Sequence, residues 1–127
     1  MGQPHRARSR VASFGYALAG LWHVLRSQRN AWIHAAASVL VVALAAFLRV
    51  AAWDWAILLL AIGLVWMAEF INSALEAVVD LASPVAHPLA RVGKDVGAAA
   101  VLIAAVTSAV VGLIILGPPL GHWLGLF

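Results

Sequence analysis

Apolar and polar residues alternate with a helical period over the first part of the chain. The apolar side chains recur three and four residues apart, so they share one face of a helix: Val11, Phe14, Leu18, Leu21, Trp22 and Leu25. A polar arm, HRARSR, precedes them, and Arg26, Gln28 and Arg29 follow. This pattern predicts an arm and an amphipathic surface helix over residues 1–30, lying in a membrane interface. A cleaved signal peptide is the alternative, but Trp22, His23 and Arg26 interrupt the apolar run and no small-residue cleavage site follows.

Three longer apolar stretches come next, at about 32–49, 55–80 and 95–116. Each is long enough for a membrane helix, which needs roughly 17–25 residues. The second is about 39 Å long at 1.5 Å per residue, so its lower end should emerge from a hydrocarbon core of ~30 Å. A polar segment, SPVAHPLARVGKD, connects it to the third, and Gly117-Pro118-Pro119 is expected to end the third.

Composition agrees with this reading, because 65% of the 127 residues are hydrophobic and 10% are charged. Soluble domains are roughly 45–50% apolar, and one this small could not bury so much apolar surface. The six tryptophans fit a membrane protein, and the absence of cysteine excludes disulfides, thiolate zinc sites and cysteine nucleophiles. We therefore predict an all-α membrane protein with one domain, residues 1–127.

The basic residues give an orientation. With three spans, the N-terminal arm and the second connection share a side, which holds seven of the eight basic residues: Arg6, Arg8, Arg10, Arg26, Arg29, Arg91 and Lys94. The other side holds Arg49 alone. The positive-inside rule then places the N-terminus in the cytoplasm. Topology and anionic lipid explain the net charge of +3, and nothing in the sequence supports a nucleic-acid partner.

Polar residues inside the second stretch are the strongest sign of chemistry. At 100° per residue they fall within an arc of about 100°: Glu69, Asn72, Ser73, Glu76 and Asp80. We call this set the polar stripe. A charge at mid-bilayer costs on the order of 2.5–3.5 kcal/mol, so such residues usually mark function. Glu69 should lie just inside the hydrocarbon, within reach of a lipid head group, and Glu76 ~10 Å nearer to water.

A purely structural role for this stripe is the alternative. Interhelical hydrogen bonds explain Asn72 and Ser73 equally well, but carboxylates are an expensive way to join helices. Small residues such as Gly93 and Gly97 are interpreted as sites of close helix packing.

Lys94-Asp95 stands at the expected start of the third span. A lysine and a helix N-terminus both favour a phosphate, and neighbouring carboxylates favour magnesium, so the two helix ends together could form a magnesium–nucleotide site. The alternative is a salt bridge from Lys94 to Asp80 or Asp95. The sequence contains neither GxxxxGK[ST] nor GxGxxG, which excludes a P-loop or Rossmann nucleotide site.

The segment EFINSALEAVVD, residues 69–80, resembles the signature E-x-x-N-[ST]-A-x-E-x-x-x-D of the prokaryotic diacylglycerol kinase and undecaprenol kinase family. The resemblance covers about 100 residues and continues through five further matches: 14–16, 20–21, 87–90, 94–95 and 98–101. The form HPLARVGKD, with Asn30 and His34, is more similar to the undecaprenol kinase branch.

This resemblance implies a homotrimer of three-span subunits in the bacterial inner (plasma) membrane, with active sites between subunits on the cytoplasmic side. It also implies magnesium-dependent transfer of the ATP γ-phosphate to a lipid hydroxyl. By motif, Glu69 would be the general base and contact the lipid, with Asn72 positioning the substrate or Glu69. Glu76 would bind magnesium. The implied nucleotide-binding residues are Tyr16, Gln28, Glu76, His87, Lys94 and Asp95.

The chain departs from the family pattern at Gln28, where many members have a glutamate taken as a second magnesium ligand. A neutral amide oxygen can ligate magnesium but supplies no charge, so we expect weaker metal affinity. Gly15 stands where many relatives have lysine, and the basic residue usual near the end of the arm is present only as Arg8 or Arg10.

The leading hypothesis is a lipid kinase, with undecaprenol the favoured acceptor and diacylglycerol second. The alternatives are an impaired homologue that acts as a membrane scaffold, or an ion or proton pathway. A pathway needs titratable groups beyond mid-bilayer, and the helix before Glu69 reads WAILLLAIGLVWMA, with none.

Overall fold

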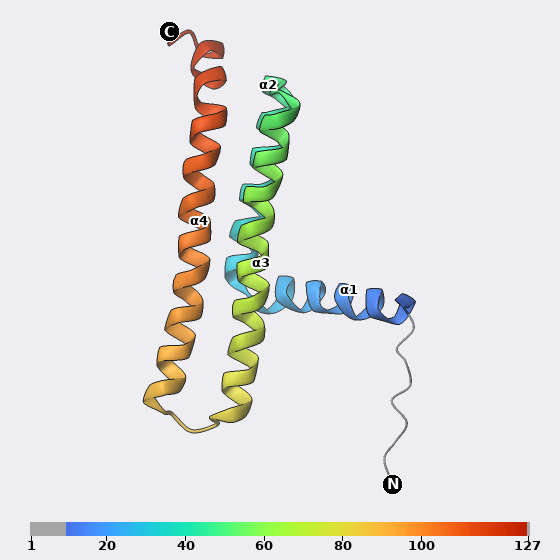
Figure 1. Ribbon diagram of the computed structural model, residues 1–127, viewed down its shortest axis with the longest axis vertical. Helices are drawn as coiled ribbons and strands as arrows, with labels where there is room; N and C mark the ends of the chain where they lie inside the picture. Colours follow the sequence, from blue (N-terminus) through green and yellow to red (C-terminus); the bar gives the residue numbers. More distant parts are fainter. Residues whose placement is uncertain (1–9, 127) are drawn as a thin grey trace.

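The computed structural model describes residues 10–126, and over this range the chain forms four helices and no strand. They are α1 (Arg10–Ser27), α2 (Arg29–Leu48), α3 (Ala52–Ala82) and α4 (Pro88–Trp123). The last three are long and apolar enough to cross a membrane. In Figure 1 they run side by side as one column, and α1 extends crosswise from it. The predicted all-α membrane fold, with a leading helix and three spans, is confirmed.

The apolar face of α1 lies mostly off the rest of the chain. Phe14 and Trp22 are exposed, and Val24 near the end of the helix is its one buried residue. The helix ends at Ser27 rather than at Asn30, and extended Gln28 makes the break before α2. A helix that turns an unpacked apolar face outward fits a membrane interface. The arm that holds Arg6 and Arg8 lies outside the described residues.

α3 and α4 form a long hairpin with the most extensive helix contact of the fold. Their 31 and 36 residues correspond to about 46 and 54 Å, so the hairpin is longer than the ~30 Å of hydrocarbon and extends beyond it. The expected start of the third helix near residue 95 was wrong. α4 begins at Pro88, since proline lacks only an N–H that the first helical turn would leave unpaired anyway. The non-helical connection is therefore only residues 83–87.

The expected end of this helix was also wrong, because α4 continues through Pro118 and Pro119 to Trp123. These prolines leave the carbonyls of Ile114 and Ile115 without their i+4 donors, a loss that membrane helices tolerate through local adjustment. The Trp123 ring packs edge-on against Phe47 of α2, with ring centroids 5.3 Å apart. This contact holds the last turn of α4 on α2.

The helices are joined near the ends of α2 and α4 by apolar packing, where Ala45, Leu58 and Leu116 form a buried cluster. Two hydrogen bonds link them nearer mid-span. Ser108 Oγ donates to the Ala61 carbonyl at 2.9 Å, and Trp66 Nε1 donates to Ser38 Oγ at 3.1 Å. Such bonds between helices are typical of membrane bundles.

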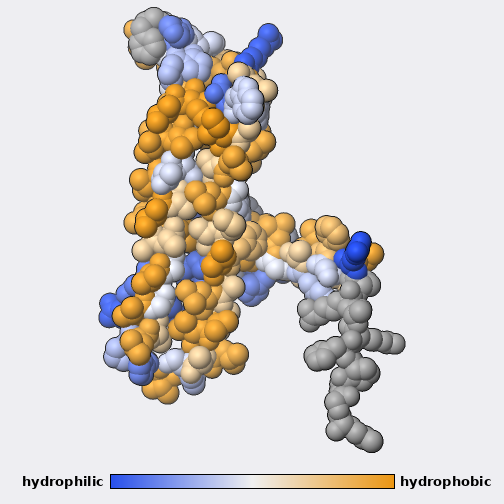
Figure 2. Space-filling view, viewed as in Figure 1, coloured by the Kyte–Doolittle hydropathy of each residue, from blue (hydrophilic) through white to orange (hydrophobic). Residues whose placement is uncertain are grey.

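Large hydrophobic side chains cover the outer faces of the column, as Figure 2 shows, with hydrophilic side chains gathered toward its ends and near the level of α1. Leu60 and Leu113, for example, are 74% and 72% exposed. A soluble monomer rarely exposes apolar surface on this scale, so the column is built for a lipid environment.

Candidate functional site

Three of the five residues of the polar stripe line one cavity of about 230 Å³, between the start of α2 and the middle of α3 and α4. We call it the Glu69 cavity. Its lining residues are Gln28, Asn30, Ile33, His34, Glu69, Asn72, Glu76, Ala98, Val101, Leu102 and Ala105. Ser73 is partly buried with an unpaired hydroxyl, and Asp80 is exposed. The stripe thus becomes more exposed along α3 from Glu69 to Asp80.

Glu69 is the most buried charged residue of the described chain, with its side chain 2% exposed. The nearest charged or titratable partner is His34 of α2, whose Nε2 lies 3.5 Å from Glu69 Oε2. The approach does not meet hydrogen-bond geometry, and both atoms are buried without a partner. A buried carboxylate oxygen without a donor is costly, so this oxygen is ready to accept a proton or a hydrogen bond.

Glu76, two turns further along α3, has both carboxylate oxygens engaged. Asn72 Nδ2 donates to Oε1 at 3.1 Å, and Gln28 Nε2 donates to Oε2 at 3.0 Å. A glutamate at position 28 would place two negative charges here, and they would repel one another without a cation. The amide of Gln28 therefore satisfies Glu76 with no metal present.

Asn72 holds this position because α4 has no side chain opposite it. A Cβ atom at Gly97 would lie 2.2 Å from Asn72 Oδ1 and 3.2 Å from a Leu75 methyl carbon. Gly97 is therefore needed for the close approach of α4 to the polar stripe, as its interpretation as a packing residue predicted.

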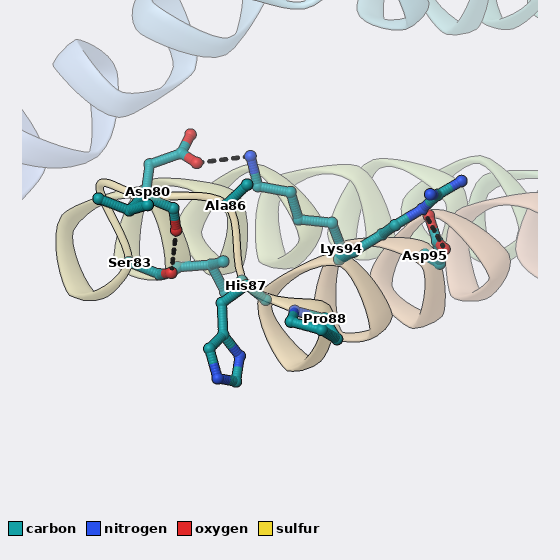
Figure 3. Close-up of a pocket in the computed structure, with 11 residues that line it drawn as sticks. Asp80, Ser83, Ala86, His87, Pro88, Lys94 and Asp95 are labelled. Atoms are coloured by element: carbon teal, nitrogen blue, oxygen red, sulfur yellow. Dashed lines mark hydrogen bonds and ion pairs between the residues drawn. The ribbon is translucent and has the colours of Figure 1, made fainter.

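A second cavity of about 530 Å³ lies at the closed end of the α3–α4 hairpin. We call it the hairpin cavity, and Figure 3 shows it. It is lined by Val79, Asp80, Ser83, Val85, Ala86, His87, Pro88, Ala90, Arg91, Lys94 and Asp95. Because the hairpin extends beyond the hydrocarbon, a soluble ligand can reach this cavity.

Charged pairs flank the hairpin cavity. Lys94 Nζ donates to Asp80 Oδ1 at 2.5 Å, which is one of the two salt bridges anticipated for this lysine, and it also lies within the electrostatic reach of Glu76. Arg91 Nε stands 3.9 Å from Asp95 Oδ2 one turn along the exposed face of α4. Two basic side chains with two acidic ones can receive a phosphate chain by exchanging partners.

His87 caps α4, since its Nδ1 accepts a hydrogen bond from the Leu89 N–H at 3.2 Å. In Figure 3 its ring and the Asp80–Lys94 pair point to opposite sides of the connection. Lys94 and Asp95 lie in the second turn of α4, so the expectation that they stand at the helix start was wrong. The N-terminus of α4 nevertheless opens into the same cavity, through His87 and Pro88.

The predicted site residues thus separate into two groups and one outlier. Gln28, Glu69, Asn72 and Glu76 line the Glu69 cavity, whereas His87, Lys94 and Asp95 line the hairpin cavity. Tyr16 lies exposed on α1 and lines neither. The structure brings Asp80 of the polar stripe into the hairpin cavity.

His34 and Asn30 were not among the residues assigned a role, yet both line the Glu69 cavity. A signal was present in the sequence. His34 is a titratable residue in an apolar span, and such residues usually face the bundle interior.

Residues 10–126 contain no group of three or more His, Cys, Asp or Glu residues able to hold a metal ion alone. Magnesium requires less, because it usually binds through one or two carboxylates and substrate phosphates. The Glu76 carboxylate is such a ligand. Gln28 faces it with the amide nitrogen, so the Gln28 amide must turn over before its oxygen can join Glu76 on a magnesium ion.

Comparison with known proteins gives consistent matches. The sequence profile of the family described as prokaryotic diacylglycerol kinase matches residues 15–116. The chain is similar to the undecaprenol kinase of Bacillus subtilis (strain 168), 39% identical over 108 residues, covering 85% of this chain and 88% of that protein. It is 42% identical over 111 residues to a diacylglycerol kinase of Synechocystis sp., covering 87% of this chain and 63% of the relative. A diacylglycerol kinase of Escherichia coli (strain K12) is 36% identical over 113 residues, covering 84% and 87%.

Replacing Gly97 by alanine should displace Asn72 and lower activity by about 100-fold, since a shift of 1 Å in a site costs that order. The control is Gly112→Ala on the same helix, where a Cβ would meet nothing within 4 Å. Phosphate-transfer rates of both variants, with their thermal unfolding temperatures, test this. Equal rates would show that the Asn72 position is not needed.

Proposed function

The chain belongs to the prokaryotic diacylglycerol kinase family and is a lipid kinase, and we propose that it transfers the γ-phosphate of ATP, with magnesium, to the hydroxyl of undecaprenol in preference to diacylglycerol. The observation that carries the proposal is the buried Glu69 carboxylate, whose Oε2 has no hydrogen-bond partner in a cavity at membrane depth. A lipid alcohol that reaches this cavity meets a base in a water-poor site.

Glu69 acts as the general base. Its carboxylate accepts the proton of the lipid hydroxyl while the hydroxyl oxygen bonds to the γ-phosphorus and the bond from that phosphorus to the leaving oxygen of ADP breaks. The products are a lipid phosphate, ADP and a proton held by Glu69. Phosphoryl transfer depends mainly on positioning and charge neutralisation, so a small set of residues is sufficient.

The nucleotide is held on the aqueous side of the same helices. Lys94 and Arg91 offer cationic groups to its phosphates in the hairpin cavity. Glu76 would supply a carboxylate oxygen for magnesium, and Gln28 would add its amide oxygen once the amide turns over. The bound ion would neutralise phosphate charge. Glu76 lies between Glu69 and Asp80 along α3, so its side chain is between the acceptor and the nucleotide.

We place the protein in the bacterial inner membrane as a multi-pass homotrimer with the closed end of the α3–α4 hairpin in the cytoplasm. The basic residues of α1, α2 and the hairpin support this orientation. Tyr16 lines neither cavity of its own subunit, so its contact with nucleotide requires α1 of a neighbouring subunit.

Undecaprenol is favoured over diacylglycerol because of the form HPLARVGKD, with Asn30 and His34, and because the Bacillus subtilis relative is named an undecaprenol kinase. A second candidate is a catalytically impaired homologue that serves as a scaffold. The hydrogen bond from Gln28 to Glu76 favours it, since it satisfies the carboxylate without a metal.

The first prediction from this proposed function concerns Glu69. Purified protein in micelles should transfer labelled phosphate from magnesium–ATP to undecaprenol faster than to diacylglycerol. Glu69→Gln should lower the rate by at least about 100-fold while leaving nucleotide affinity unchanged, because only the base is lost. Asp54→Asn, the same chemical change in the first turn of α3, should keep the wild-type rate. Transfer to neither lipid by folded wild-type protein would contradict the lipid kinase proposal.

The second prediction concerns Glu76. Glu76→Gln removes the one carboxylate proposed for magnesium, so both turnover and the affinity for magnesium–ATP should fall, the affinity by about tenfold or more. Isothermal titration of magnesium–ATP into wild type, Glu76→Gln and Glu69→Gln measures this. The same affinity in all three proteins would refute the assignment of Glu76 as metal ligand.

The third prediction concerns Gln28. Gln28→Glu sets two carboxylates side by side, so the unfolding temperature without magnesium should fall and magnesium should raise it more than in wild type. The magnesium concentration for half-maximal activity should fall about tenfold as ligand charge increases. If wild type is inactive and Gln28→Glu restores no transfer, the scaffold candidate is favoured.

A further inference from the structure

His34 is a titratable residue beside Glu69 that the proposed reaction leaves without a role. It lies on α2, facing α3, and its side chain is 13% exposed. Its Nε2 is buried, has no hydrogen-bond partner and stands 3.5 Å from Glu69 Oε2, which has none either. Two unpaired buried atoms of opposite polarity at this distance are a small adjustment away from a hydrogen bond.

We propose that His34 is a positioning residue for Glu69: its Nε2–H donates to Glu69 Oε2 and holds the carboxylate toward the hydroxyl of the acceptor lipid. This inference rests on the proposed lipid kinase function. The present distance agrees with such a role, because catalytic hydrogen bonds are often long in the free enzyme and shorten in the substrate complex.

Contacts to both the ring and the backbone of His34 connect this residue to α3. Its edge meets the Trp66 ring of α3, with centroids 6.4 Å apart and planes 72° apart. Ser38 Oγ donates to the His34 carbonyl at 2.7 Å and accepts from Trp66 Nε1 at 3.1 Å. The histidine is thus tied through backbone and ring to the helix that carries Glu69, so a movement of α2 on α3 would change the Nε2–Oε2 distance.

Within residues 10–126, no other side chain donates to Glu69 Oε2 in the structure. Gln28 and Asn72 each donate an amide hydrogen to Glu76, and Asn30 lies exposed at the start of α2. The α4 side presents hydrocarbon side chains only: Ala98, Val101, Leu102 and Ala105. His34 is also absent from the lining of the hairpin cavity, so its effect should concern the lipid side of the reaction and not nucleotide binding.

The test compares His34→Leu, which removes the donor, with His34→Gln, whose amide Nε2 donates at a similar reach. His34→Leu should lower kcat by about 10- to 100-fold with the KM for magnesium–ATP unchanged, since a misplaced catalytic group costs this order. His34→Gln should restore most of kcat. His122→Leu, the same change near the C-terminal end of α4, should behave as wild type.

A second measurement does not depend on turnover. In protein with ¹⁵N-labelled histidine, the Nε2 resonance of His34 should change on Glu69→Gln, whereas that of His122 should not. An unchanged His34 resonance would overturn the contact itself, even if His34→Leu failed to fold.

The outcomes separate the two proposals. If wild type transfers phosphate and Glu69→Gln does not, yet His34→Leu keeps wild-type kcat, the lipid kinase function stands and the role of His34 is refuted. An equal loss in His34→Gln and His34→Leu, or a parallel rise in the KM for ATP, would show a packing role instead. If wild type transfers no phosphate, the proposed function fails and the positioning role with it.

Discussion

Polar groups inside a bilayer must find their partners within the protein, because hydrocarbon offers neither donors nor acceptors. The arrangement of α2, α3 and α4 follows from this constraint at the level of Glu69. The carboxylate is withdrawn from lipid between the three helices, His34 faces it from α2, and the absence of a side chain at Gly97 lets α4 close over the neighbouring Asn72. Glu69 Oε2 remains without a hydrogen-bond partner there, so a substrate can donate a hydrogen bond to it.

The polar stripe on α3 thereby has two environments on one helix. Glu69 is buried between the helices, whereas Asp80 is exposed in the hairpin cavity with Lys94. A reaction between a molecule confined to lipid and one confined to water requires a site that reaches both environments. Glu76 lies between these two environments, and hydrogen bonds from Asn72 and Gln28 hold its carboxylate there.

Much of this was predictable from the sequence, because periodicity is a local property. The apolar stretches identify the spans, and spacing alone places Glu69, Asn72 and Glu76 on one face. Helix ends were less predictable: Pro88 begins α4 instead of preceding it, and α4 continues through Pro118 to Trp123, whose ring contacts Phe47 of α2. Neither result depends on local sequence alone.

Contacts between helices were the least predictable part. No spacing rule connects His34 with Glu69 or Gly97 with Asn72, since these pairs depend on how the spans rotate against one another. The motif resemblance identified the candidate site residues of α3, but the environment of those residues is set by α2 and α4.

The continuous helix of α3 between the two cavities has a consequence for how this chain can vary in length. One residue inserted between Glu69 and Asp80 would shift the closed end of the hairpin by about 1.5 Å and rotate it by about 100°. Asp80 and its lysine partner would then turn away from the face that Glu69 occupies. A flexible loop would absorb the same insertion without effect. Eleven residues separate Glu69 from Asp80, which is very close to three full helical turns. This separation therefore fixes both the height and the angular position of the hairpin cavity relative to the Glu69 cavity.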